Sequence, residues 1–151
     1  FMLRVLLACS ALGLLLACAP LAAFAQSTPV GTWTTIDDST HKPKSIVEIY
    51  ETTNGSLAGK VVEVLQSDEG PHPLCVKCSG ERKNKPVEGM VIMWGVRKEG
   101  RSWDDGRILD PHNGKVYSVK LTPSADGARM DVRGYMGFSL LGRSQTWLRK
   151  H

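Results

Sequence analysis

The chain has 151 residues, which is enough for one domain of ordinary size but not for two. Hydrophobic residues make up 42% and charged residues 23%, a balance typical of a globular protein and not of a disordered or fibrous chain. The net charge of +4 comes from 19 basic and 15 acidic residues spread along the sequence, so we expect no nucleic-acid partner. The same composition excludes a bundle of membrane helices and a small disulfide-rich protein.

Residues 1–25 have the features of a signal peptide. Arg4 precedes an uncharged stretch rich in Leu and Ala, and Ala23-Phe24-Ala25 places small residues at the two positions that signal peptidase reads. We therefore expect cleavage after Ala25 and a single periplasmic or secreted domain over residues 26–151. A second possibility stays open, because Leu15-Leu16-Ala17-Cys18 resembles a lipobox. Lipidation at Cys18 would produce an outer-membrane lipoprotein, and only then do we expect a membrane attachment.

From residue 27 onward, short apolar or alternating segments recur between turn residues, which is the pattern of an all-β protein. Asn54-Gly55, Asn113-Gly114 and Asp126-Gly127 supply turns, and Asp105-Gly106 suggests a bulge within a strand. The segment 90–96 is apolar on both faces, so we expect it to be covered on both sides or to pack under the long loop at about 66–87. The expected strands are 31–36, 45–51, 57–65, 90–96, 103–110, one through 117–121, one through 130–132, and 143–150.

Eight strands joined mostly by tight turns predict an up-and-down barrel with little or no helix after the signal peptide. A sandwich of two sheets is the alternative fold. The interior of an eight-stranded barrel is either filled by side chains or holds one small ligand.

Cys75 and Cys78 lie in the long loop between prolines. In an oxidising compartment we expect them to form a local disulfide. A zinc site with His72 would need a fourth ligand, and thiol–disulfide chemistry would need the pair at a helix N-terminus. Haem attachment is excluded because Ser79, not His, follows the second cysteine. We therefore expect no metal and no cofactor.

Two resemblances to known families follow from these motifs. Gly31-Thr32-Trp33 resembles the Gly-x-Trp signature of lipocalins, and this implies that Arg149 stacks over Trp33 at the barrel floor. Nearly all of residues 30–150 resemble a bacterial secreted family of uncharacterised proteins, domain of unknown function 2147. That resemblance implies a lipocalin-like barrel in the cell envelope and supplies no catalytic residues. The matching blocks, in order, are 75–84, 89–95, 106–115, 132–135 and 140–147.

Aromatic and Met side chains are the candidates for contacts with a ligand, because together they can line an apolar pocket. They can equally fill the barrel as core residues. Arg133, Arg143 and Gln145, near the last two strands, could instead hold an anionic head group, or they could be outward-facing polar residues. The candidate residues are Trp33, Tyr50, Met93, Trp94, Trp103, Tyr117, Tyr135, Phe138, Arg143 and Trp147.

These observations support three hypotheses about function, in order of preference. The first is an exported envelope protein that binds a small, largely apolar or amphipathic molecule. The second is a non-enzymatic structural or interaction module with a filled barrel, which uses the Cys75–Cys78 loop as its contact surface. The third is a thiol–disulfide oxidoreductase. No nucleophile or phosphate-binding motif is present, so we do not expect another enzyme.

Overall fold

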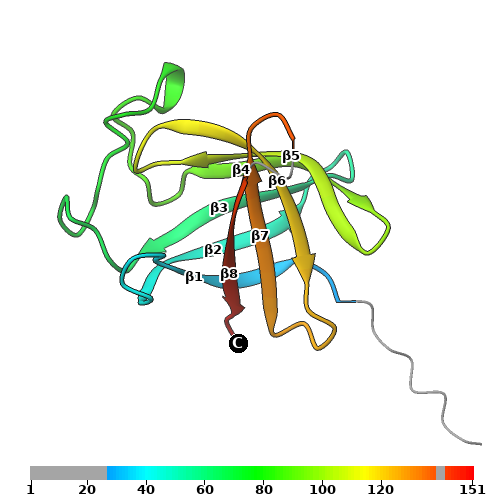
Figure 1. Cartoon of the computed structure of the whole chain (residues 1–151). Helices are drawn as coiled ribbons and strands as arrows, with labels where there is room; N and C mark the ends of the chain where they lie inside the picture. The colour runs from blue at the N-terminus through cyan, green and yellow to red at the C-terminus, as the bar shows by residue number, and fades with distance from the viewer. Residues whose placement is uncertain (1–26, 139–141) are drawn as a thin grey trace, which may run out of the picture.

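Each strand of this chain pairs with the strand before it and the strand after it, and the last strand returns to the first. The computed structural model describes residues 27–138 and 142–151, which form a closed antiparallel barrel of eight strands (Figure 1). The all-β barrel predicted from the sequence is confirmed, whereas the predicted signal peptide lies outside the described residues. The strands are β1 (Gly31–Ile36), β2 (Pro43–Glu51), β3 (Leu57–Val64), β4 (Val91–Glu99), β5 (Ser102–Asp110), β6 (Lys115–Pro123), β7 (Arg129–Tyr135) and β8 (Gly142–Arg149).

Turn chemistry read from the sequence places several strand ends correctly. Gly55 has a φ of 81°, in the left-handed region that favours glycine, and Asn54 Oδ1 accepts the backbone N–H of Ser56. The bulge predicted at Asp105-Gly106 is present, because the β5–β6 register shifts there and Asp105 has a φ of 63°.

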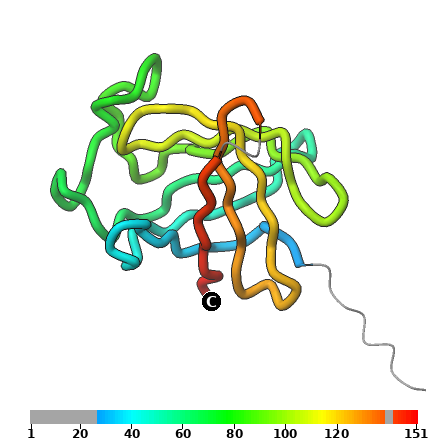
Figure 2. The backbone as a smooth tube through the Cα atoms, in the orientation of Figure 1, coloured from blue at the N-terminus to red at the C-terminus, as the bar shows by residue number. Residues whose placement is uncertain are grey.

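The connections divide the barrel into two ends (Figure 2). The floor end carries the β2–β3, β4–β5 and β6–β7 turns, the start of β1 and the end of β8. The open end carries the β1–β2 loop, the β3–β4 loop, the β5–β6 turn and the β7–β8 loop. Its largest component is the β3–β4 loop, residues 65–90, which includes the 3₁₀ turn η1 (Gly80–Arg82) and a bridge between Leu74 and Pro86.

The β3–β4 loop covers part of the outer barrel surface. Leu109 faces outward beside the exposed Val116, yet it is only 3% exposed. It belongs to the same cluster of buried side chains as Ile92 of β4, Cys75 and Val87. Arg82 of the loop also lies 4.6 Å from the ring centroid of Trp94. Of the two arrangements expected for segment 90–96, these contacts support packing under the long loop. Within the two described ranges, no helix is long and apolar enough to cross a membrane.

Candidate functional site

Arg149 closes the floor end. Its guanidinium carbon lies 4.2 Å from the ring centroid of Trp33, so the stacking implied by the lipocalin resemblance is confirmed. Its Nε donates to Gly127 O at 2.6 Å, while its two Nη atoms donate to Val30 O at 2.9 Å and Thr28 O at 2.6 Å. Arg149 thus holds both the chain entering β1 and the β6–β7 turn at the Trp33 ring.

The middle of the barrel is filled by side chains. Val96 and Val119 are fully buried, and a methyl group added to Gly106 would overlap Val96 Cγ2 and lie 3.1 Å from Val119 Cγ1. At Gly59, an added methyl group would lie 3.3 Å from Met93 Cβ. The absence of a side chain at Gly59 and Gly106 therefore lets the side chains of neighbouring strands pack closely at these two points.

The Cys75–Cys78 pair forms a disulfide, as expected. Cys75 is fully buried and Cys78 is 3% exposed. The Cys75 N–H donates to Lys85 O at 2.8 Å, and a side chain on Gly114 would overlap the backbone of Lys77. The disulfide segment is thus tied both to its own loop and to the β5–β6 turn.

His72 does not complete a metal site with these cysteines. Its Nδ1 lies 3.0 Å from Glu88 Oε2, and within the described residues no group of three His, Cys, Asp or Glu side chains is placed to hold a metal ion. The Glu88 carboxylate also accepts the Val64 N–H at 3.1 Å. That backbone hydrogen bond is the main reason why the pKa of Glu88 is lowered, with a further contribution from His72.

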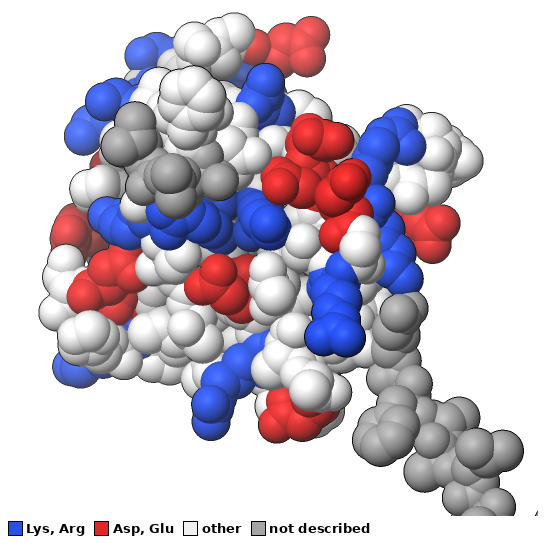
Figure 3. All heavy atoms as spheres, turned by 45° about the vertical axis from the view of Figure 1, so that its right-hand side comes forward, with Lys and Arg blue, Asp and Glu red and all other residues white. Residues whose placement is uncertain are grey.

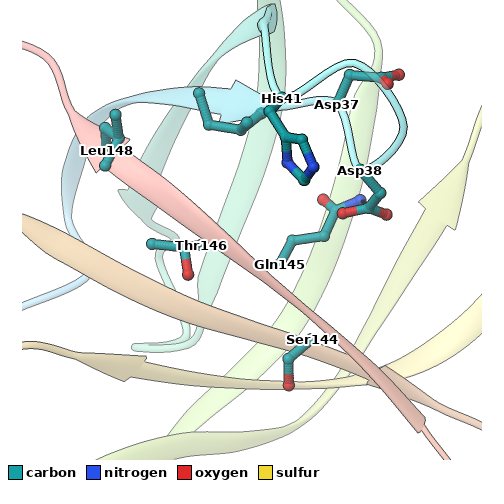
Figure 4. A pocket seen from close by; sticks show the side chains of 8 residues that line it. Asp37, Asp38, His41, Ser144, Gln145, Thr146 and Leu148 are labelled. Atoms are coloured by element: carbon teal, nitrogen blue, oxygen red, sulfur yellow. Dashed lines mark hydrogen bonds between the residues drawn. The ribbon is translucent and has the colours of Figure 1, made fainter.

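The seam between β1 and β8 is the weakest ladder of the barrel. Only Trp33↔Arg149 and Thr34↔Leu148 pair there, whereas β7 and β8 pair along seven residues. Towards the open end the two strands diverge, and a hollow of about 240 Å³ lies between the β1–β2 loop and β8 (Figure 4). We call it the seam hollow. It is lined by Ile36, Asp37, Asp38, His41, Ser144, Gln145, Thr146 and Leu148.

A hydrogen-bonded chain connects the seam hollow with the core. Trp147 Nε1 donates to Gln145 Oε1 at 3.2 Å, and Gln145 Nε2 donates to Asp38 Oδ2 at 2.9 Å. Arg143 also contacts Asp38 Oδ2 at 2.9 Å. The His41 ring points towards Asp38 and Gln145 in Figure 4. The orientation of these rim groups therefore depends on a buried tryptophan.

Asp37 fixes the loop on the other side of the hollow. The N–H groups of Thr40 and Ser39 donate to Asp37 Oδ1 at 2.8 and 2.9 Å, and Lys44 Nζ lies 3.4 Å from Oδ2. These contacts, led by the Thr40 N–H, lower the pKa of Asp37 to about 2. The hollow thus combines a charged, acceptor-rich rim with the apolar side chains of Ile36 and Leu148.

The predicted ligand residues do not converge on one place. Four lie in the core: Trp33 and Met93 are fully buried, and Trp103 and Trp147 are nearly so. Two of the predicted residues contact side chains that line the seam hollow: Arg143 contacts Asp38, and Trp147 contacts Gln145.

The remaining predicted residues lie elsewhere on the barrel. Tyr50 and Trp94 lie beneath the cations of Lys60 and Arg82, respectively. Tyr117 accepts a hydrogen bond from Asn113 Nδ2, and Tyr135 donates one to Asp104, both at 3.0 Å. Burial is the main cause that raises the pKa of Tyr135. Phe138 is exposed.

Most residues of the seam hollow were missed from the sequence. Asp37 and Asp38 directly follow the first expected strand and His41 lies just after them, so the local sequence indicates only turn and loop residues there. The hydrogen bond between Asp38 and Gln145 joins residues 107 positions apart, and no local sequence pattern predicts such a contact. The sequence does contain one indication of a site here, because the polar segment 37–41 is longer than a tight turn requires.

Residues 31–149 match the family described as "Uncharacterized protein conserved in bacteria (DUF2147)". The chain belongs to this family. This chain is similar to the solved structure of a Helicobacter pylori protein that is described as belonging to the lipocalin family. The TM-score is 0.69 and the sequence identity is 21%. The similarity covers 81% of this chain and 82% of that one, and it shows a shared lipocalin-like fold. No curated protein matches the chain.

Proposed function

We propose that this protein is exported to the cell envelope and binds a small amphipathic molecule at the open end of the barrel. The observation that carries the proposal is the seam hollow, a place where the barrel wall parts beside a polar rim connected to the core. The lipocalin-like fold supports it, because eight-stranded barrels are suited to holding one small ligand. Residues 1–25 support export, since they have the features of a signal peptide.

The lining of the hollow defines the chemical class of the ligand. Asp37 and Asp38 supply negative charge and hydrogen-bond acceptors, and Ile36 and Leu148 supply apolar contact. A volume of about 240 Å³ lies below the roughly 300–1,000 Å³ of usual ligand pockets. We therefore propose a ligand that presents a short apolar group together with an amine or hydroxyl donor, as a whole molecule or as one end of a larger one.

Ligand binding is tested first by native mass spectrometry of the protein purified from the bacterium that produces it. NMR titration with short alkylamines and hydroxylated fatty acids follows. We expect shifts at Gln145, Thr146 and the Trp147 indole. Asp38→Asn should weaken binding about tenfold, the cost of one charge-assisted hydrogen bond, while Asp68→Asn in the β3–β4 loop serves as the matched control. A native protein free of small molecules together with flat titrations would refute the proposal.

Export is tested separately by sequencing the N-terminus of the mature protein. We expect it to begin at Gln26 and to fractionate with periplasmic or secreted proteins. If Cys18 is found to be lipidated, the mature protein is an outer-membrane lipoprotein and does not begin at Gln26. An uncleaved chain in the cytoplasm would contradict export by either route.

A second candidate, a non-enzymatic interaction module, is favoured by the packing around Gly106. A barrel without internal space must act through its surface, and the disulfide segment presents the exposed apolar side chains Leu74 and Val76. Crosslinking in intact cells through a photoreactive residue at position 76 would capture a protein partner. Leu74→Ser in the same protein should lower the yield of the crosslinked product without changing ligand titrations.

Thiol–disulfide exchange receives no support from the position of the cysteines. Attack on a disulfide requires access to a sulfur atom, and both cysteines are buried. We propose that the purified protein does not reduce insulin; turnover abolished by Cys75→Ser would establish the oxidoreductase instead.

A further inference from the structure

The seam hollow contains a strand edge without a partner. Lys150 N–H donates to Thr32 O at 2.9 Å, so every second residue of β8 turns its N–H and C=O groups towards β1. Thr146 and Ser144 belong to this set, but the β1–β8 ladder ends at Leu148. Within residues 27–138 and 142–151, the ladder therefore gives neither of them a partner in β1. Their N–H groups are available to another chain.

The end of β1 presents a second free edge on the other side of the hollow. Asp37 N–H donates to Lys42 O at 2.9 Å, which places the Asp37 N–H on the side of β2. The N–H and C=O groups of the preceding residue, Ile36, therefore point the other way, towards β8. In the part of the chain that the structure describes, the ladder pairs Ile36 with no residue of β8. The hollow thus lies between two strand edges.

The side chains around these edges suit an extended segment. Because Trp147 is buried in the core, the neighbouring side chains of Thr146 and Leu148 face outward. Leu148 and Ile36 supply apolar contact to the hollow, whereas Thr146 and Ser144 are small and polar (Figure 4). The hollow therefore offers edges for backbone hydrogen bonds beside an apolar strip.

Charge does not decide which molecule occupies the hollow. Asp38 crosses its mouth, where it contacts Gln145 and Arg143, both at 2.9 Å. The Arg143 and Asp38 side chains are 72% and 36% exposed, and an ion pair so exposed adds little stability, so an entering segment can displace it. On the face shown in Figure 3, basic and acidic side chains are mixed, with uncharged side chains between them. Recognition through the backbone needs no net charge on this surface.

We propose that the seam hollow takes a short extended peptide, which pairs through its backbone with Thr146 and Ser144 of β8 and with Ile36 of β1. Free strand edges are templates for strand addition, in which backbone hydrogen bonds supply most of the affinity. An occupant that lies between two edges must have both of its own edges free, and a strand of a second folded barrel does not. The inference rests on the proposed function, because it names the class of molecule that this same hollow binds.

The test compares two peptides by NMR titration of the purified protein: acetyl-Val-Thr-Val-Thr-amide, and the same peptide with its backbone amide nitrogens methylated. Methylation removes the N–H donors and keeps every side chain. We expect the unmethylated peptide, near saturation, to slow hydrogen exchange of the Thr146 amide about tenfold or more. The Trp147 amide, which faces β7, should keep its exchange rate. The methylated peptide should bind about tenfold or more weakly.

Two variants at one position separate the backbone from the side chain. Thr146→Pro removes the N–H that faces the hollow and should weaken peptide binding about tenfold. Thr146→Ala keeps this N–H and should weaken binding about threefold at most. Circular dichroism checks the folding of both variants. If Thr146→Pro does not fold, the comparison of the two peptides decides without it.

Three results would overturn the proposal. The first is equal binding of the methylated and unmethylated peptides, and the second is an equal loss of binding in the two variants. The third is protection of the Thr146 amide that rises with protein concentration without peptide, which would assign the edge to a second copy of the chain. Shifts with short alkylamines but none with the peptide would overturn this inference and leave the proposed function standing, whereas flat titrations with every probe would overturn both.

Discussion

At the scale of single residues, two positions account for much of the closed, filled character of this barrel. Arg149 joins the chain entering β1, the β6–β7 turn and the Trp33 ring through one planar group. Gly106 leaves room on β5 for the side chains of Val96 and Val119, which come from the two flanking strands β4 and β6. Position 149 needs a side chain with several hydrogen-bond donors in fixed directions, whereas position 106 must have no side chain.

Arg149→Lys should destabilise the protein although it preserves the charge. An ammonium group cannot donate in the three fixed directions that the guanidinium uses, and it stacks less well on an aromatic ring. We expect a loss of about 2–3 kcal/mol in the free energy of unfolding, measured by urea denaturation followed through tryptophan fluorescence. Lys150→Ala, at the exposed neighbouring position, should change it by less than about 0.5 kcal/mol.

Gly106→Ala should be destabilising by about 1–3 kcal/mol, because the added methyl group meets Val96 and the carbonyl oxygen of Trp94. Gly134→Ala is the control, since its added methyl group would lie 3.8 Å from Tyr117 Cβ, an ordinary contact. The two variants are compared by urea denaturation under the same conditions. Equal stability of the two would mean that the barrel has free interior space.

At the scale of elements, the β3–β4 loop is attached to the barrel at several points. The Cys75 contact with Pro111 O, the Arg82–Trp94 stacking at 4.6 Å and the Glu88–Val64 hydrogen bond tie different parts of it to the barrel, while the disulfide closes a ring within the loop itself. Such attachments act on the loop itself more than on the whole fold, because most of the barrel packing lies elsewhere.

Removal of the disulfide should be a local event. A ring closed by cysteines three positions apart restricts the unfolded chain little, so Cys75→Ala/Cys78→Ala should lower the free energy of unfolding by about 1–2 kcal/mol. Hydrogen exchange should accelerate chiefly in residues 66–87. Labelling of the unmodified protein with a thiol reagent, without reductant, should find neither cysteine free; a labelled native Cys75 would contradict the buried disulfide.

The attachment through Glu88 should depend on pH. The pKa of Glu88 is lowered from its ordinary value of 4.5, so its stabilising contribution is present above that value and is lost as the pH falls through the lowered pKa. We expect the Val64 amide to exchange faster, relative to other β3 amides, as the pH falls below 4.5. Glu88→Gln should remove this pH dependence. Glu63→Gln, in β3 next to Val64, should leave it intact.

At the scale of the whole molecule, closure of the barrel is uneven. The β1–β8 ladder pairs two residues on each strand, and the β6–β7 ladder pairs six. The barrel wall is therefore weakest at the seam hollow, where the first and last strands of the chain meet.

Native-state hydrogen exchange should show this difference. Lys150 N–H donates to Thr32 O, so alternation along β8 directs the N–H groups of Thr146 and Ser144 towards β1, beyond the last paired residue. We expect these two amides to exchange much faster than the Trp147 amide, which faces β7. Similar protection for all three would mean that β1 and β8 are joined along their whole length.

The sequence by itself determined the number and order of the strands, most turns, the bulge at Asp105 and the stacking of Arg149 on Trp33. The strands, turns and bulge depend on local alternation and turn residues that can be read within a few positions. The stacking of Arg149 on Trp33 joins distant residues and was implied by the resemblance to lipocalins. Phe138 was also named from the sequence, but its exposure was not predictable, since apolar residues are equally suited to core and surface roles.

Only the tertiary structure decided that Trp33, Met93 and Trp147 fill the barrel, and that a polar hollow lies at its seam. Both facts depend on distances between residues far apart in the chain, such as Asp38 and Gln145, and on how the last strand meets the first. Alternation shows which side chains face inward, but not whether the space between them is filled. That depends on the radius of the closed barrel and on where glycines such as Gly106 leave room for the side chains of neighbouring strands.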